Sequence, residues 1–134
     1  MITDLSHLQI NVRPENLGFY KDLMARLGWT TIHADNATIG VKGTDRNSLW
    51  FCAIAKKVNN DYDGPGMNHI GISAPAMADV DNVCEWLKEH DVAMLFSTPR
   101  HRPEFTGSAD QTYYQVMFES PDRILWEVVY YGPK

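Results

Sequence analysis

Two short stretches, in corresponding places of the two halves of the chain, alternate between apolar and polar positions. The first covers residues 7–12 and the second residues 69–73, and in each the aliphatic residues occupy every second position while the opening histidine lies in the other phase. Because successive side chains of a β-strand point to opposite faces, each stretch is predicted to be a strand with one apolar face and one histidine-bearing face. The side chains that we expect to be buried under helices are Leu8, Ile10, Ile70 and Ile72.

Each predicted strand is followed by a segment with helical periodicity. In residues 14–27, and again in residues 78–90, apolar side chains recur every three or four positions, which is typical of a helix with one buried face. Pro14 is tolerated in the first turn of the earlier helix, and Gly28 suits the position after its last turn. The order of strand and then helix therefore occurs twice, with a repeat of about half the chain.

Further strand patterns follow both helices. In the first half, turn-forming residues at 35–36 and 42–45 separate them. In the second half, residues 98–111 form the longest irregular stretch, and the order βαβββ is repeated if a short strand or an ordered part of this loop fills the third place. The predicted strands are residues 29–33, 38–41, 48–54, 93–96, 113–119 and 124–130.

The length and the apolar content limit the size and the surroundings of the protein. A chain of 134 residues fits a single α+β domain, which we divide into module 1 (1–55), a polar, turn-prone linker (56–65) and module 2 (66–134). No apolar run approaches the roughly 20 residues of a membrane helix. The first residues also lack the basic start and apolar core of a signal peptide. We therefore expect a cytoplasmic protein that makes no membrane contact.

Charge and cysteine content narrow the possible partners. Twelve basic and seventeen acidic residues give a net charge of −5, and the chain has no basic run. This argues against nucleic acid as a partner, because a phosphate backbone is bound by clustered lysines and arginines. Cys52 and Cys84 lack the Cys-x-x-Cys spacing of a metal or redox pair, so we expect two reduced thiols.

Three residues form a candidate metal site: His7, His69 and Glu127. Each histidine opens the first strand of its module, and Glu127 lies in the last predicted strand. Two imidazoles and one carboxylate can hold a divalent ion and leave positions open for a substrate, although such ligands do not select among Fe, Mn, Zn and Ni. A single histidine in a strand is more often structural, and a strand glutamate can simply face water. Their joint occurrence in corresponding places of two modules favours the metal site.

Taken together, these landmarks resemble a known family. The paired βαβββ modules, the histidine that opens each module and the glutamate after the turn Ser120-Pro121-Asp122 are similar to the vicinal oxygen chelate superfamily of glyoxalase I, extradiol dioxygenases, fosfomycin-resistance enzymes and bleomycin-resistance proteins. The resemblance implies that the two modules pair and form a curved mixed sheet around a cleft, and that the protein is a homodimer. In this chain Arg123 follows the turn, where many members have glycine.

For function, the resemblance implies a metal-dependent enzyme, a lyase, oxidoreductase or transferase, whose small substrate chelates one divalent ion through paired oxygens. Glyoxalase I has a further glutamate ligand in the last strand of its first module, whereas residues 47–54 contain no carboxylate. The resemblance therefore implies a lyase or dioxygenase-like member, whose two histidines and one glutamate match the ligand set of fosfomycin-resistance enzymes and extradiol dioxygenases. The alternative is a metal-free protein that sequesters a drug or metabolite, as bleomycin-resistance proteins do.

The long loop and the following strand supply further candidate site residues. Extradiol dioxygenases use a histidine and a tyrosine beside the metal ligands, which here are His101 and either Tyr113 or Tyr114. We take Glu127, His101 and Tyr114 as candidate catalytic residues. Tyr113 and Gln115 are added as candidate substrate-binding residues.

Two arginines and a tryptophan complete the predicted substrate site. Arg100 and Arg102 can hold a carboxylate or phosphonate through paired hydrogen bonds, although loop arginines are more often solvated. Trp50 lies in the strand where glyoxalase I has its fourth ligand. It is either the wall of a pocket or a core aromatic residue.

Overall fold

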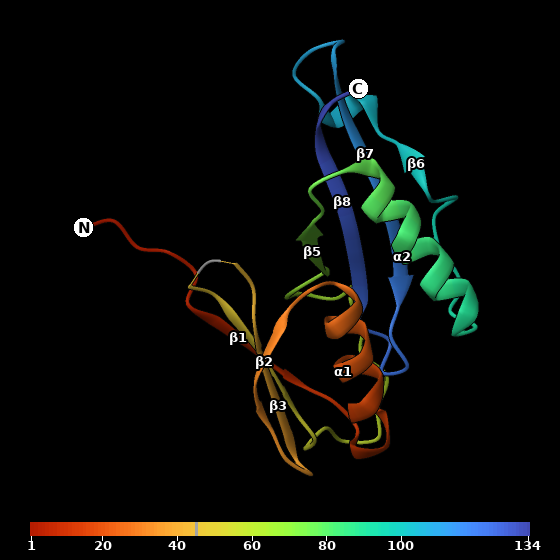
Figure 1. Ribbon diagram of the computed structural model, residues 1–134. Helices are drawn as coiled ribbons and strands as arrows, with labels where there is room; N and C mark the ends of the chain where they lie inside the picture. The colour runs from red at the N-terminus through yellow and green to blue at the C-terminus, as the bar shows by residue number, and fades with distance from the viewer. Residues whose placement is uncertain (45) are drawn as a thin grey trace. The chain divides into compact units, whose positions relative to one another are not determined.

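The computed structural model describes residues 1–44 and 46–134 and divides the chain into two compact units (Figure 1). The first unit is Met1–Asn59 and the second is Asn60–Lys134, and each is described by itself. Asp45, in the turn expected at 42–45, lies outside the described residues. In the described part of the chain, no helix combines the length and the apolar character that a membrane crossing requires.

The first unit is a four-stranded sheet covered on one face by a helix. Its elements are β1 (His7–Asn11), η1 (Pro14–Asn16), α1 (Leu17–Arg26), β2 (Thr30–Ala34), β3 (Thr38–Lys42) and β4 (Ser48–Cys52). The strand order is β1-β4-β3-β2, in which β1 runs parallel to β4 and the other neighbours are antiparallel. The core of this unit joins the buried face of α1 to one face of the sheet, and its side chains include Tyr20, Leu23, Met24, Val41 and Phe51.

The second unit repeats this topology. Its elements are β5 (His69–Ser73), α2 (Met77–Glu89), β6 (Arg100–His101), η2 (Pro103–Phe105), β7 (Gln111–Glu119) and β8 (Leu125–Pro133). The order is β5-β8-β7-β6, again with the first strand parallel to its neighbour. Figure 1 shows α2 lying across one face of β7 and β8. The predicted α+β fold with two βαβββ modules is thus confirmed at the level of each unit.

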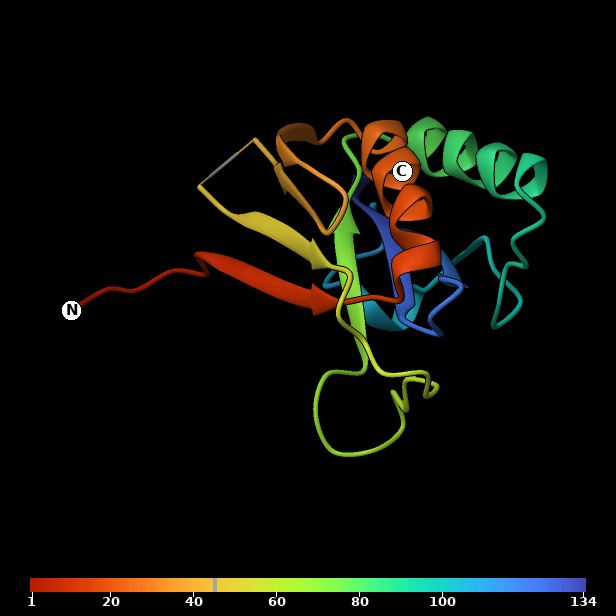
Figure 2. The ribbon, with the colours of Figure 1, turned by 90° about the horizontal axis from the view of Figure 1, so that it is seen from below.

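The period-two alternation places the two histidines on the sheet faces that the helices do not cover. In β5, Ile70 and Ile72 are buried, whereas His69 is exposed. In β1, Ile10 is buried and His7 is exposed, but Leu8 is only half-buried, contrary to expectation. The reason is local: residues 1–6 are all exposed and extend away from β1 (Figure 2), so that they give the start of the strand no cover.

The predicted strand at residues 93–96 is wrong. Met94 forms only an isolated bridge with Phe118, and the chain then turns, because Phe96 and Ser97 have φ angles of 55° and 57°. Such left-handed backbone cannot continue a strand. The second strand of the unit, in chain order, is instead β6, which lies inside the stretch at 98–111 that was expected to be irregular.

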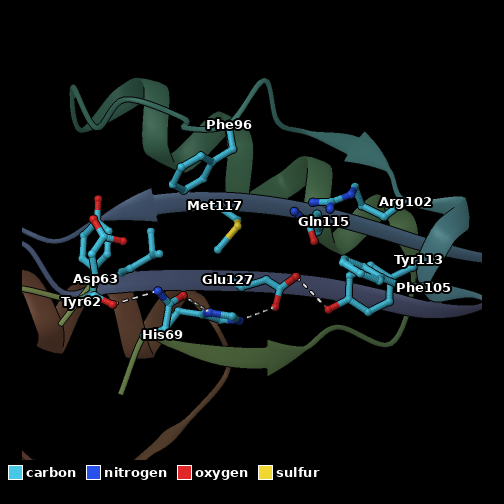
Figure 3. A pocket seen from close by; sticks show the side chains of 12 residues that line it. Tyr62, Asp63, His69, Phe96, Arg102, Phe105, Tyr113, Gln115, Met117 and Glu127 are labelled. Carbon is cyan, nitrogen blue, oxygen red and sulfur yellow. Dashed lines mark hydrogen bonds and ion pairs between the residues drawn. The ribbon is translucent and has the colours of Figure 1, made fainter. Parts of the chain in front are cut away.

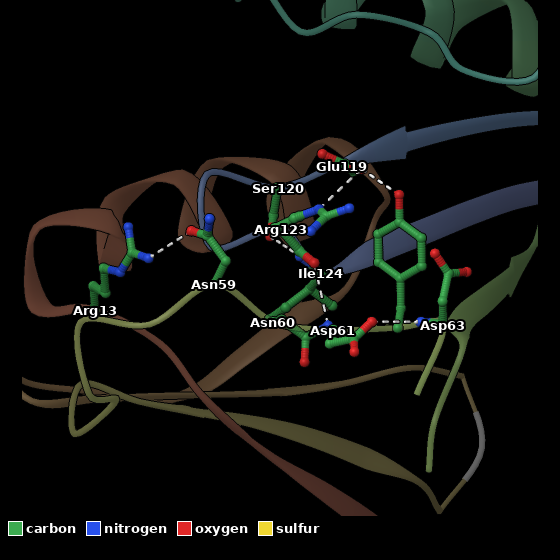
Figure 4. A network of polar contacts seen from close by, with 10 residues as sticks. Arg13, Asn59, Asn60, Asp61, Asp63, Glu119, Ser120, Arg123 and Ile124 are labelled. Carbon is green, nitrogen blue, oxygen red and sulfur yellow. Dashed lines mark hydrogen bonds and ion pairs between the residues drawn. The ribbon is translucent and has the colours of Figure 1, made fainter. Parts of the chain in front are cut away.

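The turn between β7 and β8 is anchored to the segment that precedes β5 (Figure 4). The backbone N–H of Arg123 donates to the Ser120 carbonyl over 2.8 Å, which closes the predicted turn, and Arg123 itself has a φ angle of 58°. The Asn60 amide donates to the Arg123 carbonyl over 3.2 Å. The Arg123 guanidinium lies 5.2 Å from the centre of the Tyr62 ring, and the Tyr62 hydroxyl donates to Glu119. Residues 60–62 are therefore attached to the hairpin.

Candidate functional site

The face of the second sheet opposite α2 forms the floor of a pocket of about 560 Å³. Across the adjacent strands β5, β8 and β7, Gly71 and Met117 are the direct neighbours of Glu127 on either side. Gly71 lies directly beside the glutamate: a Cβ there would be in ordinary van der Waals contact with Glu127 Oε2, at 3.4 Å, which leaves no space for a larger side chain. Figure 3 shows the side chains that line the pocket, with Glu127 and Met117 near its middle.

Glu127 is buried in this floor and has polar partners on both sides. Only 5% of the residue is exposed, and both carboxylate oxygens have partners. The Tyr113 hydroxyl donates to Oε1 over 2.9 Å, and His69 Nε2 lies 3.2 Å from Oε2. A buried carboxylate without such partners would be strongly destabilising. The site therefore maintains a carboxylate in a position from which water is largely excluded.

The orientation of His69 is fixed from its far side. Asn68 donates its amide N–H to the Tyr62 carbonyl over 2.9 Å, so that its Oδ1 faces His69 Nδ1 at 2.8 Å. Because Oδ1 can only accept, Nδ1 carries the hydrogen, and Nε2 is the nitrogen that faces Glu127. Nε2 then either donates to the carboxylate as part of an imidazolium or offers its lone pair to a cation.

These residues fit part of a metal site. An imidazole nitrogen and a carboxylate oxygen face each other, and the other imidazole nitrogen is held by an amide oxygen, as is usual for metal-binding histidines. Among the described residues, no group of three or more His, Cys, Asp or Glu side chains is placed to hold an ion. His69 and Glu127 supply two of the three ligands expected. His7 belongs to the first unit, where it is exposed and its Nδ1 lies 3.1 Å from Ser6 Oγ.

Tyr113 is a hydrogen-bond donor in this site. Burial, together with the hydrogen bond to the carboxylate of Glu127, raises the pKa of Tyr113 to about 12. The hydroxyl therefore keeps its proton at neutral pH and remains a donor to Glu127.

Polar and aromatic groups meet at one end of the pocket. The Arg102 guanidinium lies 4.5 Å from the centre of the Phe105 ring, and its Nε donates to Glu104. The Phe105 ring packs edge-on against Tyr113. Gln115 lines the floor and is only 1% exposed, yet its Nε2 has no hydrogen-bond partner in the described part of the chain.

The structure does not bring His101 or Tyr114 to this pocket. The two residues are paired across β6 and β7, with ring centres 4.7 Å apart, on the face that α2 covers. Tyr114 donates to Asp81 of that helix over 2.7 Å, and His101 Nδ1 lies 2.6 Å from Thr112 Oγ1. Of the two tyrosines left open by the sequence, Tyr113 is therefore the one beside Glu127.

Arg100 and Trp50 also lie outside the pocket lining. Arg100 is exposed and is the β6 partner of Gln115. Trp50, in the first unit, is half-buried on the sheet face that bears His7, and its indole N–H donates to Ser48 Oγ over 3.0 Å. Its ring covers Gly40, where a Cβ would approach it to 2.7 Å. The core aromatic residue of β4 is instead Phe51, which is fully buried.

Several pocket residues were missed by the sequence reasoning. Asn68 directly precedes His69, and an amide beside a candidate ligand was a usable signal. Phe96 and Phe105 lie in irregular segments, where no periodicity predicts which way a side chain points, and about half of each residue is exposed. Met117 lies on the same face of β7 as Tyr113 and Gln115, and counting alternate positions would have found it.

Comparison with known proteins identifies the family. Residues 5–128 match the model of the Glyoxalase/Bleomycin resistance protein/Dioxygenase superfamily. The chain belongs to this superfamily. The comparison with curated protein sequences gave no match.

Solved structures share the fold. A candidate glyoxalase from Bacillus halodurans is 25% identical, with a TM-score of 0.76 and 94% of each chain covered. The fosfomycin resistance protein FosX from Listeria monocytogenes, solved with Mn(II) and sulfate, is 19% identical, with a TM-score of 0.68 over 96% of this chain and 90% of that one. Oxidase ChaP-H2 is 14% identical, with a TM-score of 0.66 over 97% and 94% of the two chains. Members that differ in reaction thus share this scaffold.

Proposed function

We propose that this protein is a metal-dependent enzyme of the superfamily, a lyase or dioxygenase-like oxidoreductase acting on a small substrate with two neighbouring oxygens. The observation that carries the proposal is the approach of His69 Nε2 to Glu127 Oε2 inside the pocket. A transferase reaction is the further possibility within the superfamily. FosX, which shares the fold, was solved with Mn(II).

In this proposal, His7, His69 and Glu127 hold one divalent ion, which is Fe, Mn, Zn or Ni. When bound, such an ion supplies Lewis-acid chemistry to a chelating substrate. The protein's own groups fix the arrangement. Asn68 holds Nδ1–H of the imidazole so that Nε2 is directed into the pocket, and Tyr113 donates to the carboxylate oxygen that His69 does not face. Both contacts reduce the reorganisation needed when substrate arrives.

Metal analysis tests the proposal. Protein purified without chelator or histidine tag should contain, or take up on titration, about one equivalent of divalent metal. Glu127→Gln should reduce uptake below about a tenth of an equivalent and abolish turnover, with little loss of stability, because a buried carboxylate is replaced by an amide of equal size. Glu85→Gln is the control, since this carboxylate lies on α2, on the other face of the sheet, and is paired with Lys88. Wild-type protein that takes up no metal would contradict the proposal.

A metal-free sequestering protein is the second candidate, and one observation favours it. The pocket walls include Phe96 and Phe105, large apolar side chains that are 53% and 52% exposed. Exposed aromatic groups around a cleft bind apolar ligands without chemistry. Tight ligand binding by protein that takes up no metal would support this candidate.

The same proposal extends to the organisation of the protein. We propose that residues 1–134 act as one cytoplasmic domain with module 1 (1–55), a linker (56–65) and module 2 (66–134), that the modules pair around a cleft, and that two chains form a homodimer. Support comes from the repeated topology and from family membership. Light scattering at micromolar concentration tests the dimer, and a monomer would contradict it.

A further inference from the structure

A buried amide in the pocket floor lacks a partner. Gln115 is 1% exposed, and its Nε2 makes no hydrogen bond within the described part of the chain. Buried polar side chains almost always have a partner, and leaving one unpaired is destabilising. Gln115 lines the pocket (Figure 3), so a partner can reach it from the pocket. The amide therefore indicates an acceptor group on a bound ligand.

Strand geometry places a cation near this amide. Arg100 is the cross-strand partner of Gln115, and the backbone N–H of Arg102 donates to the Tyr113 carbonyl over 2.7 Å. Arg102 is thus a diagonal neighbour of Gln115 on the same sheet face, at a backbone distance of about 7–8 Å that long side chains span. Both residues line the pocket, and the side chain of Arg102 is only 20% exposed.

The contacts of Arg102 leave donors available. Glu104 binds Nε, and the Phe105 ring supports one face of the guanidinium, which fixes its plane. The two terminal nitrogens carry the remaining four N–H donors. Glu104 offsets part of the positive charge of Arg102. An anion should therefore bind more tightly when both Arg102 and the neutral amide of Gln115 donate to it than when Arg102 acts alone.

The remaining walls define the body of the ligand. Phe96 and Met117 line the pocket, and Figure 3 shows the Phe96 ring above the Met117 thioether. Glu127 lies on the same floor as Met117, its β7 partner. Negative charge at Glu127, near the middle of the floor, and positive charge at Arg102, at one end, therefore give the pocket two regions of opposite sign.

We propose that Gln115 and Arg102 bind the carboxylate of a small ligand whose aromatic or branched apolar body packs against Phe96 and Met117. The substrate class is then an apolar monocarboxylate. This inference rests on the proposed function, in which a second pair of oxygens on the substrate faces His69 and Glu127. Gln115 and Arg102 hold the carboxylate of the ligand away from the carboxylate of Glu127, and this fixes the orientation of the ligand in the pocket.

Calorimetric titration with matched probes tests this assignment. Phenylacetate and 3-phenylpropionate carry the carboxylate, and 2-phenylethanol is the neutral control. We expect the carboxylates to bind about tenfold more tightly than the alcohol. Gln115→Met keeps the length of the side chain and removes the donor, and Arg102→Gln removes the charge. Each should weaken carboxylate binding about tenfold and leave the alcohol unaffected. Lys88→Gln makes the same change in net charge on α2, which covers the other face of the sheet, and should have no effect.

A stability measurement separates ligand binding from a structural role. Because Gln115→Met removes an unpaired buried donor, its melting temperature should equal or exceed that of the wild type while its carboxylate affinity falls. A lower melting temperature with unchanged affinity would mean that the amide is paired by water only, and would overturn the proposal. So would equal binding of acids and alcohol, equal losses in Arg102→Gln and Lys88→Gln, or no carboxylate binding at millimolar concentration.

Performing each titration with chelator-treated and with Mn²⁺-treated protein distinguishes this proposal from the proposed function. Donor-dependent carboxylate binding by protein that takes up no Mn²⁺ would support the Gln115 and Arg102 site and contradict the metalloenzyme. Mn²⁺ uptake that depends on Glu127, without preference for carboxylates, would do the reverse.

Discussion

The amide of Asn68 joins the backbone carbonyl of Tyr62 to the imidazole of His69. Its N–H donates to the carbonyl over 2.9 Å, and its Oδ1 lies 2.8 Å from Nδ1. The first hydrogen bond fixes which end of the amide faces the histidine. The second keeps a hydrogen on Nδ1 and directs Nε2 towards Glu127.

Replacing Asn68 should therefore weaken metal binding more than it weakens the fold. We expect Asn68→Leu to lower Mn²⁺ or Zn²⁺ affinity about 10–100-fold, because the imidazole loses its orienting partner. Asn68→Asp keeps an acceptor for Nδ1–H but loses the N–H that donates to the Tyr62 carbonyl, so it should restore only part of the affinity. Asn82→Leu removes an exposed amide of α2, on the other face of the sheet, and serves as the control. Equal affinities in Asn68→Leu and the wild type would contradict the assignment.

Gly71 gives a graded test of the space around Glu127. A Cβ at this position would lie 3.4 Å from Oε2, which is ordinary contact, whereas the branches of a valine would displace the carboxylate. We expect Gly71→Ala to bind metal like the wild type and to be more stable by about 0.5–1 kcal/mol, because alanine loses less backbone entropy on folding. Gly71→Val should lose metal binding. Metal titration and urea denaturation of both variants measure these effects, and normal uptake by Gly71→Val would show that the carboxylate position does not matter.

Arg123 occupies a left-handed turn position, with a φ angle of 58°. Arg123→Ala and Arg123→Gly both lose the cation–π contact with Tyr62 and the 3.8 Å ion pair with Glu119. Only glycine removes the backbone strain as well. The glycine variant should therefore be more stable than the alanine variant by about 1 kcal/mol in urea denaturation. An alanine variant of equal or greater stability would contradict this account of the turn.

Cys84 should make stability depend on pH at the alkaline end. Burial raises the pKa of the Cys84 thiol from 9.0 to about 11, and the nearby carboxylate of Asp81 adds to the effect. The neutral thiol is thus favoured in the folded state. Its contribution is complete below pH 9 and is lost as pH rises from about 9 to about 11, because the unfolded chain releases this proton first.

We expect wild-type protein to lose on the order of 1–3 kcal/mol more stability than Cys84→Ala across this interval. The measurement is urea denaturation at a series of pH values. The comparison with the variant cancels the titration of tyrosines, several of which also have raised pKa values. Parallel curves for the two proteins would contradict the prediction.

Periodicity predicted the parts of the site that lie on regular strands. The alternation in β5 correctly predicted that His69 and Ile70 point to opposite faces of the sheet. The same rule could not choose between Tyr113 and Tyr114, because adjacent residues of β7 face opposite sides and both faces of this strand are partly apolar. The cross-strand register and the position of α2 decide that question, and neither is a local property of the sequence.

The irregular segment could not be predicted for a different reason. At two residues, β6 is too short for any period to be recognised, and its pairing with β7 depends on contacts distant in sequence. Residues 93–96 look like a strand, but the left-handed backbone at Phe96 and Ser97 ends the extension. The same turn exposes Phe96. It therefore explains both the wrongly predicted strand at 93–96 and the failure to predict that Phe96 lines the pocket.

Tyr62 contacts both the group that orients His69 and the turn between β7 and β8. Its carbonyl accepts from the amide that orients His69, while its hydroxyl binds Glu119 and its ring supports Arg123. A substitution in the turn at 120–123 that shifts Tyr62 would reorient the imidazole without altering a ligand. Under the proposed function, the hairpin turn is thus a position from which metal affinity can be adjusted at a distance, through the backbone that orients the imidazole and not through a ligand.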